Sequence, residues 1–236
     1  MKMLKDPSGI LLIDKPEGIT SHDVVACVRK KGHFSKVGHA GTLDPLATGL
    51  LVLLVGRATR TSSSFIQNEK SYEATIALGA STETGDREGK PIRYGSYETV
   101  TLEKVQKTFE TLRGPQVQIP PMYSAVKHQG RRLYQMARQG ISVERSPREI
   151  LIRTLELLVF QPPTLSFFLV CSKGTYVRTL VETMGERWEC PSHLSSLRRL
   201  QSGIFSVEEA VPFEKVRHLT REALLHFLRE LPESGP

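Results

Sequence analysis

The sequence contains few cysteines and no long hydrophobic run. Its three cysteines, Cys27, Cys171 and Cys190, are far apart and show no CxxC or Cys/His ligand spacing, which argues against a disulfide framework and a zinc site. The apolar run at residues 10–13 ends at Asp14 and is too short for a signal peptide or a membrane span. We therefore expect a cytoplasmic protein that is not inserted in a membrane.

Several catalytic signatures are also missing. Gly89 and Lys90 are followed by Pro91 rather than by Ser or Thr, so there is no Walker phosphate loop. Neither a G-x-S-x-G nucleophile elbow nor a zinc deaminase motif occurs. The net charge of +7 and the pI of about 9.4 are instead typical of proteins that bind nucleic acids.

Acidic residues are absent from two stretches that carry many basic residues. None lies between Glu110 and Glu144, where the basic side chains are Arg113, Lys127, Arg131, Arg132 and Arg138, with Tyr123 and Tyr134 among them. A solvated charged face would have the same composition, but we favour an arm that binds phosphates and stacks on bases. Residues 24–43 also lack acids and hold four Lys or Arg residues directly before Asp44, which places positive potential beside that carboxylate.

The hydrophobic pattern predicts a mixed chain of helices and strands. Strands are expected at residues 10–13, 50–55, 72–78, 150–160 and 165–171. One helix is expected to begin at Thr20 or Ser21 and to end at Gly32, and another to span residues 101–112 with Thr99 or Thr101 as its cap. Residues 81–96 are expected to form a polar loop, and a further helix follows "CSKGTY".

The stretch "KVGHAGTLDPLATGLLVLLVG" places one histidine and one aspartate on a glycine-rich loop before the expected strand at 50–55. Alone, the Asp-Pro pair could simply shape a turn, and His39 could be a structural histidine. Arg178 could likewise be a surface residue of its helix, and Tyr72 and Tyr176 could be core residues with a tethered hydroxyl. Each signal is weak by itself.

Together these stretches resemble the TruB family of pseudouridine synthases. "GHAGTLDPLATGLL" resembles the active-site loop of that family. In the same order along the chain, the other segments that resemble it are "GILLIDKPEGITSHDVV", "KSYEATIALGASTETGDREG", "IPPMYSAVKHQGRRLYQMARQG", "CSKGTYVRTL" and "HLSSLRRLQSGIF". The resemblance covers roughly residues 9–212, and six separate motifs in one order leave little room for chance.

The resemblance implies an α+β pseudouridine synthase fold, with a mixed, largely antiparallel central sheet flanked by helices. The catalytic domain is expected at residues 1–212, with a basic RNA-binding thumb insertion at about 115–147. Residues 213–236 are expected to be a helical tail, without the PUA domain that many relatives carry. The implied reaction converts uridine to pseudouridine at position 55 in the T-loop of tRNA. It is expected to need no cofactor, metal or protein partner, and the enzyme is expected to be a monomer.

The resemblance also implies roles for individual residues. Asp44 is the catalytic carboxylate, Arg178 keeps it charged, and Tyr72 stacks on the flipped uracil and assists proton loss at C5. Expected substrate contacts are His39, Gly41, Thr42, Leu43, Tyr176, Leu197, Lys127, Arg131 and Arg132. The sequence leaves open whether Asp44 adds to the base, adds to C1′ or removes the C2′ proton.

Three other functions are weighed against this one. A glycoside hydrolase usually needs a second carboxyl group, which Asp86 could supply. A guide-RNA-dependent relative of the same superfamily usually brings further domains and partners. A non-catalytic RNA-binding module has no need of Asp44 paired with Arg178, although a second role in tRNA refolding stays open.

Overall fold

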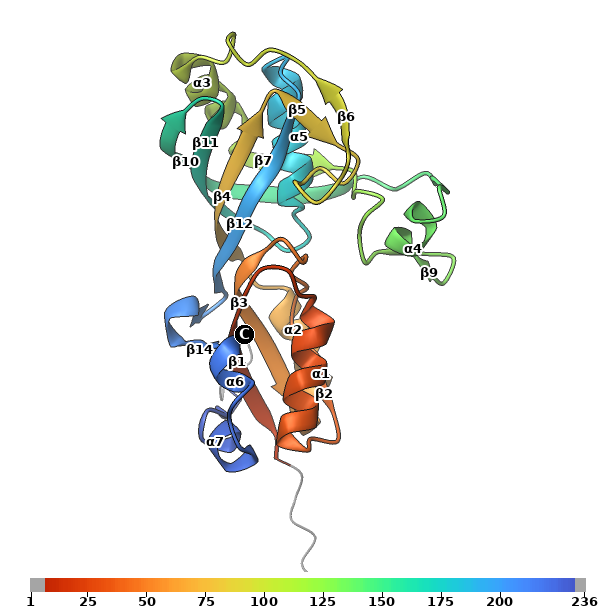
Figure 1. Ribbon diagram of the computed structural model, residues 1–236, viewed down its shortest axis with the longest axis vertical. Coiled ribbons are helices and arrows are strands. Elements are labelled where there is room, and N and C mark those ends of the chain that lie inside the picture. The colour runs from red at the N-terminus through yellow and green to blue at the C-terminus, as the bar shows by residue number, and fades with distance from the viewer. Residues whose placement is uncertain (1–6, 232–236) are drawn as a thin grey trace, which may run out of the picture. The chain divides into compact units, whose positions relative to one another are not determined.

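The computed structural model describes residues 7–231, so residues 1–6 and 232–236 of the predicted catalytic domain and tail lie outside the described residues. The chain separates into two compact units. Unit 1 contains the chain up to Tyr72 and from Leu197 onward, and unit 2 contains Glu73–Ser196. Strands β4 (Lys70–Leu78) and β12 (Ser192–Ser202) run from one unit into the other (Figure 1).

Unit 1 is built around strands in the order β14-β1-β3-β12. Its strands are β1 (Gly9–Lys15), β2 (Val37–His39), β3 (Thr48–Val55), β13 (Phe205–Ser206) and β14 (Val211–Pro212). Its helices are α1 (Ser21–Gly32), α2 (Ser62–Ile66), α6 (Phe213–Val216) and α7 (Arg221–His226), with short 3-10 turns η1 (Gly56–Thr61) and η2 (Val207–Glu209). β1 pairs antiparallel with β3, with Gly9 opposite Val55, whereas β12 and β3 run parallel, with Arg199 opposite Gly49.

Both faces of the β1 and β3 strands are buried, which explains the continuous apolar run of β3. Alternate residues of a strand point to opposite faces. Leu51 and Leu53 belong to a core cluster with α1, α6 and α7, while Leu50 and Val52 pack with Phe65 and Phe205 on the other face. The predicted tail therefore contributes to the core of unit 1 from Phe213 onward.

Unit 2 continues the strand order as β12-β4-β11-β10-β7. Its own strands are β5 (Ala80–Thr82), β6 (Pro91–Tyr94), β7 (Gly114–Gln118), β8 (Lys127–His128), β9 (Arg131–Arg132), β10 (Arg148–Gln161) and β11 (Thr164–Cys171). Its helices are α3 (Leu102–Leu112), α4 (Leu133–Ala137) and α5 (Val177–Arg187). Phe109 of α3 packs edge-on against Phe167 of β11, and the Trp188 indole after α5 donates to the Thr108 hydroxyl at 2.9 Å.

Most strand pairings of the large sheet are antiparallel, and helices flank it, which confirms the predicted fold class. The five predicted strands and the helices capped by Thr20 and Thr101 are confirmed. The prediction of a polar loop at residues 81–96 was wrong, because β5 and β6 pair there as a two-stranded ribbon. All four residues of β6 are exposed, so this strand has no hydrophobic alternation to reveal it.

The first part of the predicted thumb, at residues 115–118, forms most of β7, which pairs with β10. The segment that leaves the sheet therefore begins after Gln118. It contains the β8–β9 hairpin and α4, and in Figure 1 these lie to one side of the sheet strands of the same unit. Within residues 7–231, no helix is both long and apolar enough to cross a membrane.

Candidate active site

The residues predicted for the site divide between the two units. Unit 1 holds Asp44, His39, Gly41, Thr42, Leu43, Tyr72 and Leu197. Unit 2 holds Arg178, Tyr176, Lys127, Arg131 and Arg132. Each group has its own supporting structure.

Asp44 lies half-buried on the loop between β2 and β3, as the sequence predicts. The hydroxyl of Ser21, at the start of α1, accepts from the Leu43 amide at 2.8 Å and donates to the Leu43 carbonyl at 2.9 Å. On the other side, the Ala47 amide donates to the Asp44 carbonyl at 3.0 Å. These bonds fix the peptide groups on both sides of Asp44.

Two buried cations donate hydrogen bonds to carbonyls of the same loop and of the segments next to it. Lys15 at the end of β1 is fully buried, and its ammonium donates to the carbonyls of Pro16 and Ile19 at 2.8 Å and of Pro45 at 3.3 Å. Arg199 of β12 donates to the carbonyls of Gly41, at 3.1 Å, and Leu50, at 2.7 Å. Buried charged groups need hydrogen-bond partners, and here the partners are backbone carbonyls. Side chains of β1 and β12 therefore help to fix the conformation of the loop.

The other predicted residues of unit 1 have different degrees of exposure. His39 is half-buried on β2, opposite Leu53, and Thr42 is exposed. Tyr72 is only 8 % exposed on β4. Leu43 is buried in the core cluster, against which Leu197 also packs, so Leu43 supports the loop through its side chain and its backbone.

Arg178 of α5 is 5 % exposed and is held by three groups of unit 2. Its Nη1 donates to the Thr84 carbonyl at 2.8 Å, and its Nη2 donates to the Tyr123 carbonyl at 2.7 Å. Its Nε lies 3.7 Å from the carboxylate of Asp86. The guanidinium is a rigid planar fork, so contacts on three sides give it one orientation.

Asp86 is itself fixed by its neighbours. Its Oδ1 accepts from the Thr84 hydroxyl at 2.6 Å and from the Glu88 amide at 3.1 Å. Glu182, one turn after Arg178 on α5, is the second acid of this region. Burial is the main influence on Glu182 and raises the pKa of its carboxyl, while Arg178 opposes that rise and Asp86 adds to it.

Tyr176 immediately precedes α5, and its backbone is tied to the end of β7. Its amide donates to Gln118 Oε1 at 2.8 Å, and its carbonyl accepts from Gln118 Nε2 at 3.0 Å. The start of α5 is thus anchored beside the point where the predicted thumb leaves the sheet.

Lys127, Arg131 and Arg132 are exposed on the β8–β9 hairpin. Its turn residues Gln129 and Gly130 both have positive φ angles, 49° and 84°, as the tight turn of a two-residue hairpin requires. At the end of α4, which follows the hairpin, the guanidinium of the C-cap residue Arg138 lies 5.6 Å from the centre of the Tyr134 ring. The segment presents basic and aromatic groups together, as nucleic-acid-binding surfaces do.

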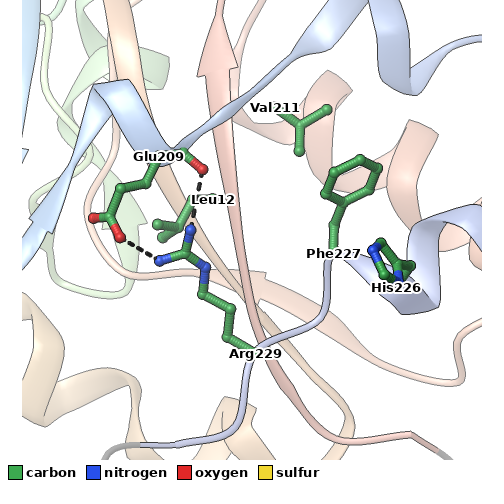
Figure 2. Close-up of a pocket in the computed structure, with 6 residues that line it drawn as sticks. All are labelled: Leu12, Glu209, Val211, His226, Phe227 and Arg229. Carbon is green, nitrogen blue, oxygen red and sulfur yellow. Dashed lines mark hydrogen bonds and ion pairs between the residues drawn. The ribbon is translucent and has the colours of Figure 1, made fainter.

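Unit 1 also contains a small cavity of about 180 Å³, shown in Figure 2. It is lined by Leu12, Glu209, Val211, His226, Phe227 and Arg229. In it the Arg229 guanidinium donates to Glu209 twice, from Nη1 to the carboxylate Oε1 at 2.6 Å and from Nη2 to the backbone carbonyl at 3.2 Å. None of these residues is a predicted site residue.

Five residues that support the site were not predicted from the sequence: Lys15, Ser21, Asp86, Gln118 and Arg199. Local signals existed for two of them. Lys15 lies two positions after the apolar run at residues 10–13, and "TGDREG" around Asp86 is typical of a turn in which an aspartate binds nearby backbone amides. Nothing local indicates that Arg199 is buried, because its carbonyl partners are about 150 residues away in the sequence.

Comparison with known proteins assigns the chain to a family. A family model described as TruB family pseudouridylate synthase (N terminal domain) matches residues 29–177. The tRNA pseudouridine synthase B of Syntrophotalea carbinolica is 44% identical over 227 residues, 96% of this chain and 74% of its own length. That of Desulfotalea psychrophila is 45% identical over 230 residues, 95% of this chain and 93% of its own.

A solved structure has a similar fold. A chain of a Cbf5-Nop10-Gar1 complex superimposes with a TM-score of 0.71 at 27% identity. The alignment covers 94% of this chain and 60% of that one. Because the family model matches more than half of this chain, and because the two relatives are 44% and 45% identical to it, the chain belongs to the TruB family of pseudouridylate synthases.

Proposed function

We propose that this protein converts uridine to pseudouridine at position 55 in the T-loop of tRNA. The observation that carries the proposal is the loop of Asp44, which presents a half-buried carboxylate from a backbone bonded to Ser21, Lys15 and Arg199. Preorganised geometry of this kind is what an enzyme needs at a reacting group. Two relatives that align with at least 95% of this chain carry the name tRNA pseudouridine synthase B.

The reaction is an isomerisation, so its atoms balance without a cofactor. The bond between N1 and C1′ breaks, the uracil turns, C5 bonds to C1′, and the proton of C5 is released while N1 gains one. We assign the catalytic carboxylate to Asp44, in any of the three roles that the sequence leaves open. Leu197, which packs on the core beside the loop, is proposed to keep the detached uracil in place.

The target uridine must leave its stack before Asp44 can reach it. Flipping a base costs about a few kcal/mol, and stacking on an aromatic ring returns roughly 1–3 kcal/mol per base. We assign this stacking to Tyr72, together with assistance to proton loss at C5. His39, Gly41, Thr42, Leu43 and Tyr176 are proposed as further contacts of the target loop.

Arg178 is proposed to keep the catalytic carboxylate ionised, since a nearby guanidinium favours the charged form of a carboxyl group. Its bonds to the Thr84 and Tyr123 carbonyls, and its position beside Asp86, support a fixed orientation of the guanidinium. Tyr123 belongs to the segment that leaves the sheet. The arginine therefore links α5 to the base of that segment.

Two basic surfaces are proposed to bind the tRNA backbone. One is the thumb, with Lys127, Arg131 and Arg132 exposed on its hairpin. The other is in unit 1, where Asp44 is the only acidic residue between positions 24 and 68. The exposed basic residues between these positions are Arg29, Lys30, Lys31, Lys36, Arg57 and Arg60. Contacts of this type neutralise phosphates and make affinity depend strongly on salt.

We further propose that the enzyme acts as a monomer in the cytoplasm and on the bare tRNA. A guide-dependent activity is the second candidate, favoured by the TM-score of 0.71 to a chain of a Cbf5-Nop10-Gar1 complex. The higher identity to the tRNA pseudouridine synthases B supports the first candidate. A transcript without guide RNA or added protein separates the two.

The test maps pseudouridine on a tRNA transcript by carbodiimide modification and reverse transcription. The purified protein should produce one stop, at position 55, and none on a transcript with cytidine there. Glu73→Gln is a control variant that should give the same stop as the wild type, since Glu73 is exposed on β4 next to Tyr72 and has no proposed role. A stop elsewhere, or a stop that appears only with guide RNA and partner proteins, would contradict the proposal.

A further inference from the structure

Arg199 is a buried arginine whose side chain is bound by backbone carbonyls. It lies on β12 and is 1 % exposed. Its Nε donates to Leu50 at 2.7 Å, its Nη2 to Gly41 at 3.1 Å, and its Nη1 is 3.5 Å from the Thr42 carbonyl. Two of the carbonyls belong to the loop that carries Asp44, and the third, that of Leu50, belongs to the start of β3, which follows the loop.

The neighbouring arginine has a different environment. Arg198 forms a two-pronged ion pair with the Asp14 carboxylate, at 2.7 and 3.0 Å, and is partly exposed. The hydrogen bonds of Arg199 in the described chain all go to carbonyl oxygens. Burying a guanidinium without a carboxylate is costly, so an apolar side chain would serve better if filling space were its only role.

Two glycines with positive φ angles, Gly41 and Gly49, lie next to Arg199. Gly49, with φ at +95°, lies opposite Arg199 in the parallel pairing of β3 and β12, and a Cβ there would lie 2.2 Å from the Arg199 carbonyl oxygen. Gly41, with φ at +120°, faces the guanidinium, since its Cβ would lie 3.5 Å from Nη1. Positive φ angles of this size favour glycine. The two glycines thus adjust the backbone on both sides of Asp44 to the side chain and strand of Arg199.

We propose that Arg199 is a positioning residue for the reaction, a role that rests on the proposed function. Its guanidinium ties the Gly41 and Thr42 carbonyls, which precede Asp44, to the Leu50 carbonyl, which follows it. The planar fork fixes the distance between the backbone segments before and after Asp44, and so the place from which the Asp44 carboxylate meets the target uridine. A lysine at this position keeps the charge but has no fork.

The test compares Arg199→Lys and Arg199→Ala with the wild type under single-turnover conditions on a tRNA transcript. We expect the rate of pseudouridine formation to fall about 10- to 100-fold in Arg199→Ala, since small displacements of a reacting group have effects of this size. The rate of Arg199→Lys should lie between those of the wild type and Arg199→Ala. The dissociation constant for tRNA should change less than about threefold in both, because Arg199 is buried and offers the RNA no surface.

Chemical rescue distinguishes positioning from a purely structural role. Guanidinium chloride at millimolar concentration should raise the single-turnover rate of Arg199→Ala, whereas urea at the same concentration should not. If Arg199→Ala does not fold, as judged by circular dichroism, Arg199→Lys decides the question. A wild-type rate in a folded variant, or a rate loss matched by an equal loss of tRNA binding, would overturn the proposal.

Hydrogen exchange tests the same inference without the reaction. Amides of residues 40–50 should exchange faster in Arg199→Lys than in the wild type, while those of α3 in unit 2 should be unchanged. Equal protection of residues 40–50 in both proteins would overturn the positioning role. Failure of the proposed function is distinguishable, since the wild type itself would then form no pseudouridine.

Discussion

Replacing Ser21 with alanine tests whether the loop of Asp44 is held as the structure indicates. The Ser21 hydroxyl is the hydrogen-bond partner of both the Leu43 amide and the Leu43 carbonyl, and both residues are buried. Ser21→Ala therefore removes two bonds and leaves two buried backbone groups without that partner. At roughly 1–2 kcal/mol for each group, the free energy of unfolding should fall by about 2–4 kcal/mol.

The adjacent Thr20 provides a matched control. Its hydroxyl caps α1 by accepting from the Asp23 amide at 3.1 Å, within a capping box. Thr20→Ala should cost about 1 kcal/mol of stability and should not move the loop, because the hydrogen bonds of Thr20 within the described residues are with Asp23 and Val24 of α1. Urea denaturation of both variants gives the free energies of unfolding.

The effect on activity should separate the two variants. Single-turnover pseudouridine formation, measured where each variant is fully folded, should slow about tenfold or more in Ser21→Ala and should stay near the wild-type rate in Thr20→Ala. Equal rates in the two folded variants would refute the reasoning that Ser21 holds the reacting loop.

Three further predictions concern pH, packing and RNA binding. Burial raises the pKa of Glu182 above its ordinary 4.5, so folding binds a proton and wild-type stability should fall as pH rises from 4.5 through the raised pKa; Glu182→Gln should lack that decline in denaturation measured across pH. Gly49→Ala should lose roughly 3 kcal/mol or more of unfolding free energy, because its Cβ would overlap the Arg199 carbonyl oxygen; unchanged stability in urea would contradict this packing. The double variant Arg131→Gln/Arg132→Gln should make the fall of log affinity for tRNA with log salt less steep, by roughly 1–2 units of slope. An unchanged slope in filter binding would exclude these residues from phosphate contact.

Local signals were sufficient for most of the fold. The run of apolar residues in β3, the alternation in β4 and the caps at Thr20 and Thr101 are read from neighbouring residues, and the structure confirms them. β6 could not be predicted in this way, since pairing of its backbone with β5 defines it while its side chains are exposed.

The site was predicted less completely, because its supports are distant in sequence. Asp44 was predicted on a loop before a core strand, and the structure places it there. The sequence offered no sign that Arg199 would be buried against carbonyls, or that Asp86 would lie beside Arg178, 92 positions along the chain. Charged side chains are mostly exposed, so composition predicts a surface position for such residues until the fold supplies their partners.

The central claim is that Asp44 performs a cofactor-free isomerisation of uridine in tRNA. The most direct test is release of tritium from a tRNA transcript labelled at C5 of uridine, with the purified wild type and Asp44→Asn and without added cofactor. We predict release by the wild type, none by Asp44→Asn, and similar tRNA binding by both. Release by Asp44→Asn at the wild-type rate, or no release by a wild type that binds the tRNA, would contradict the claim.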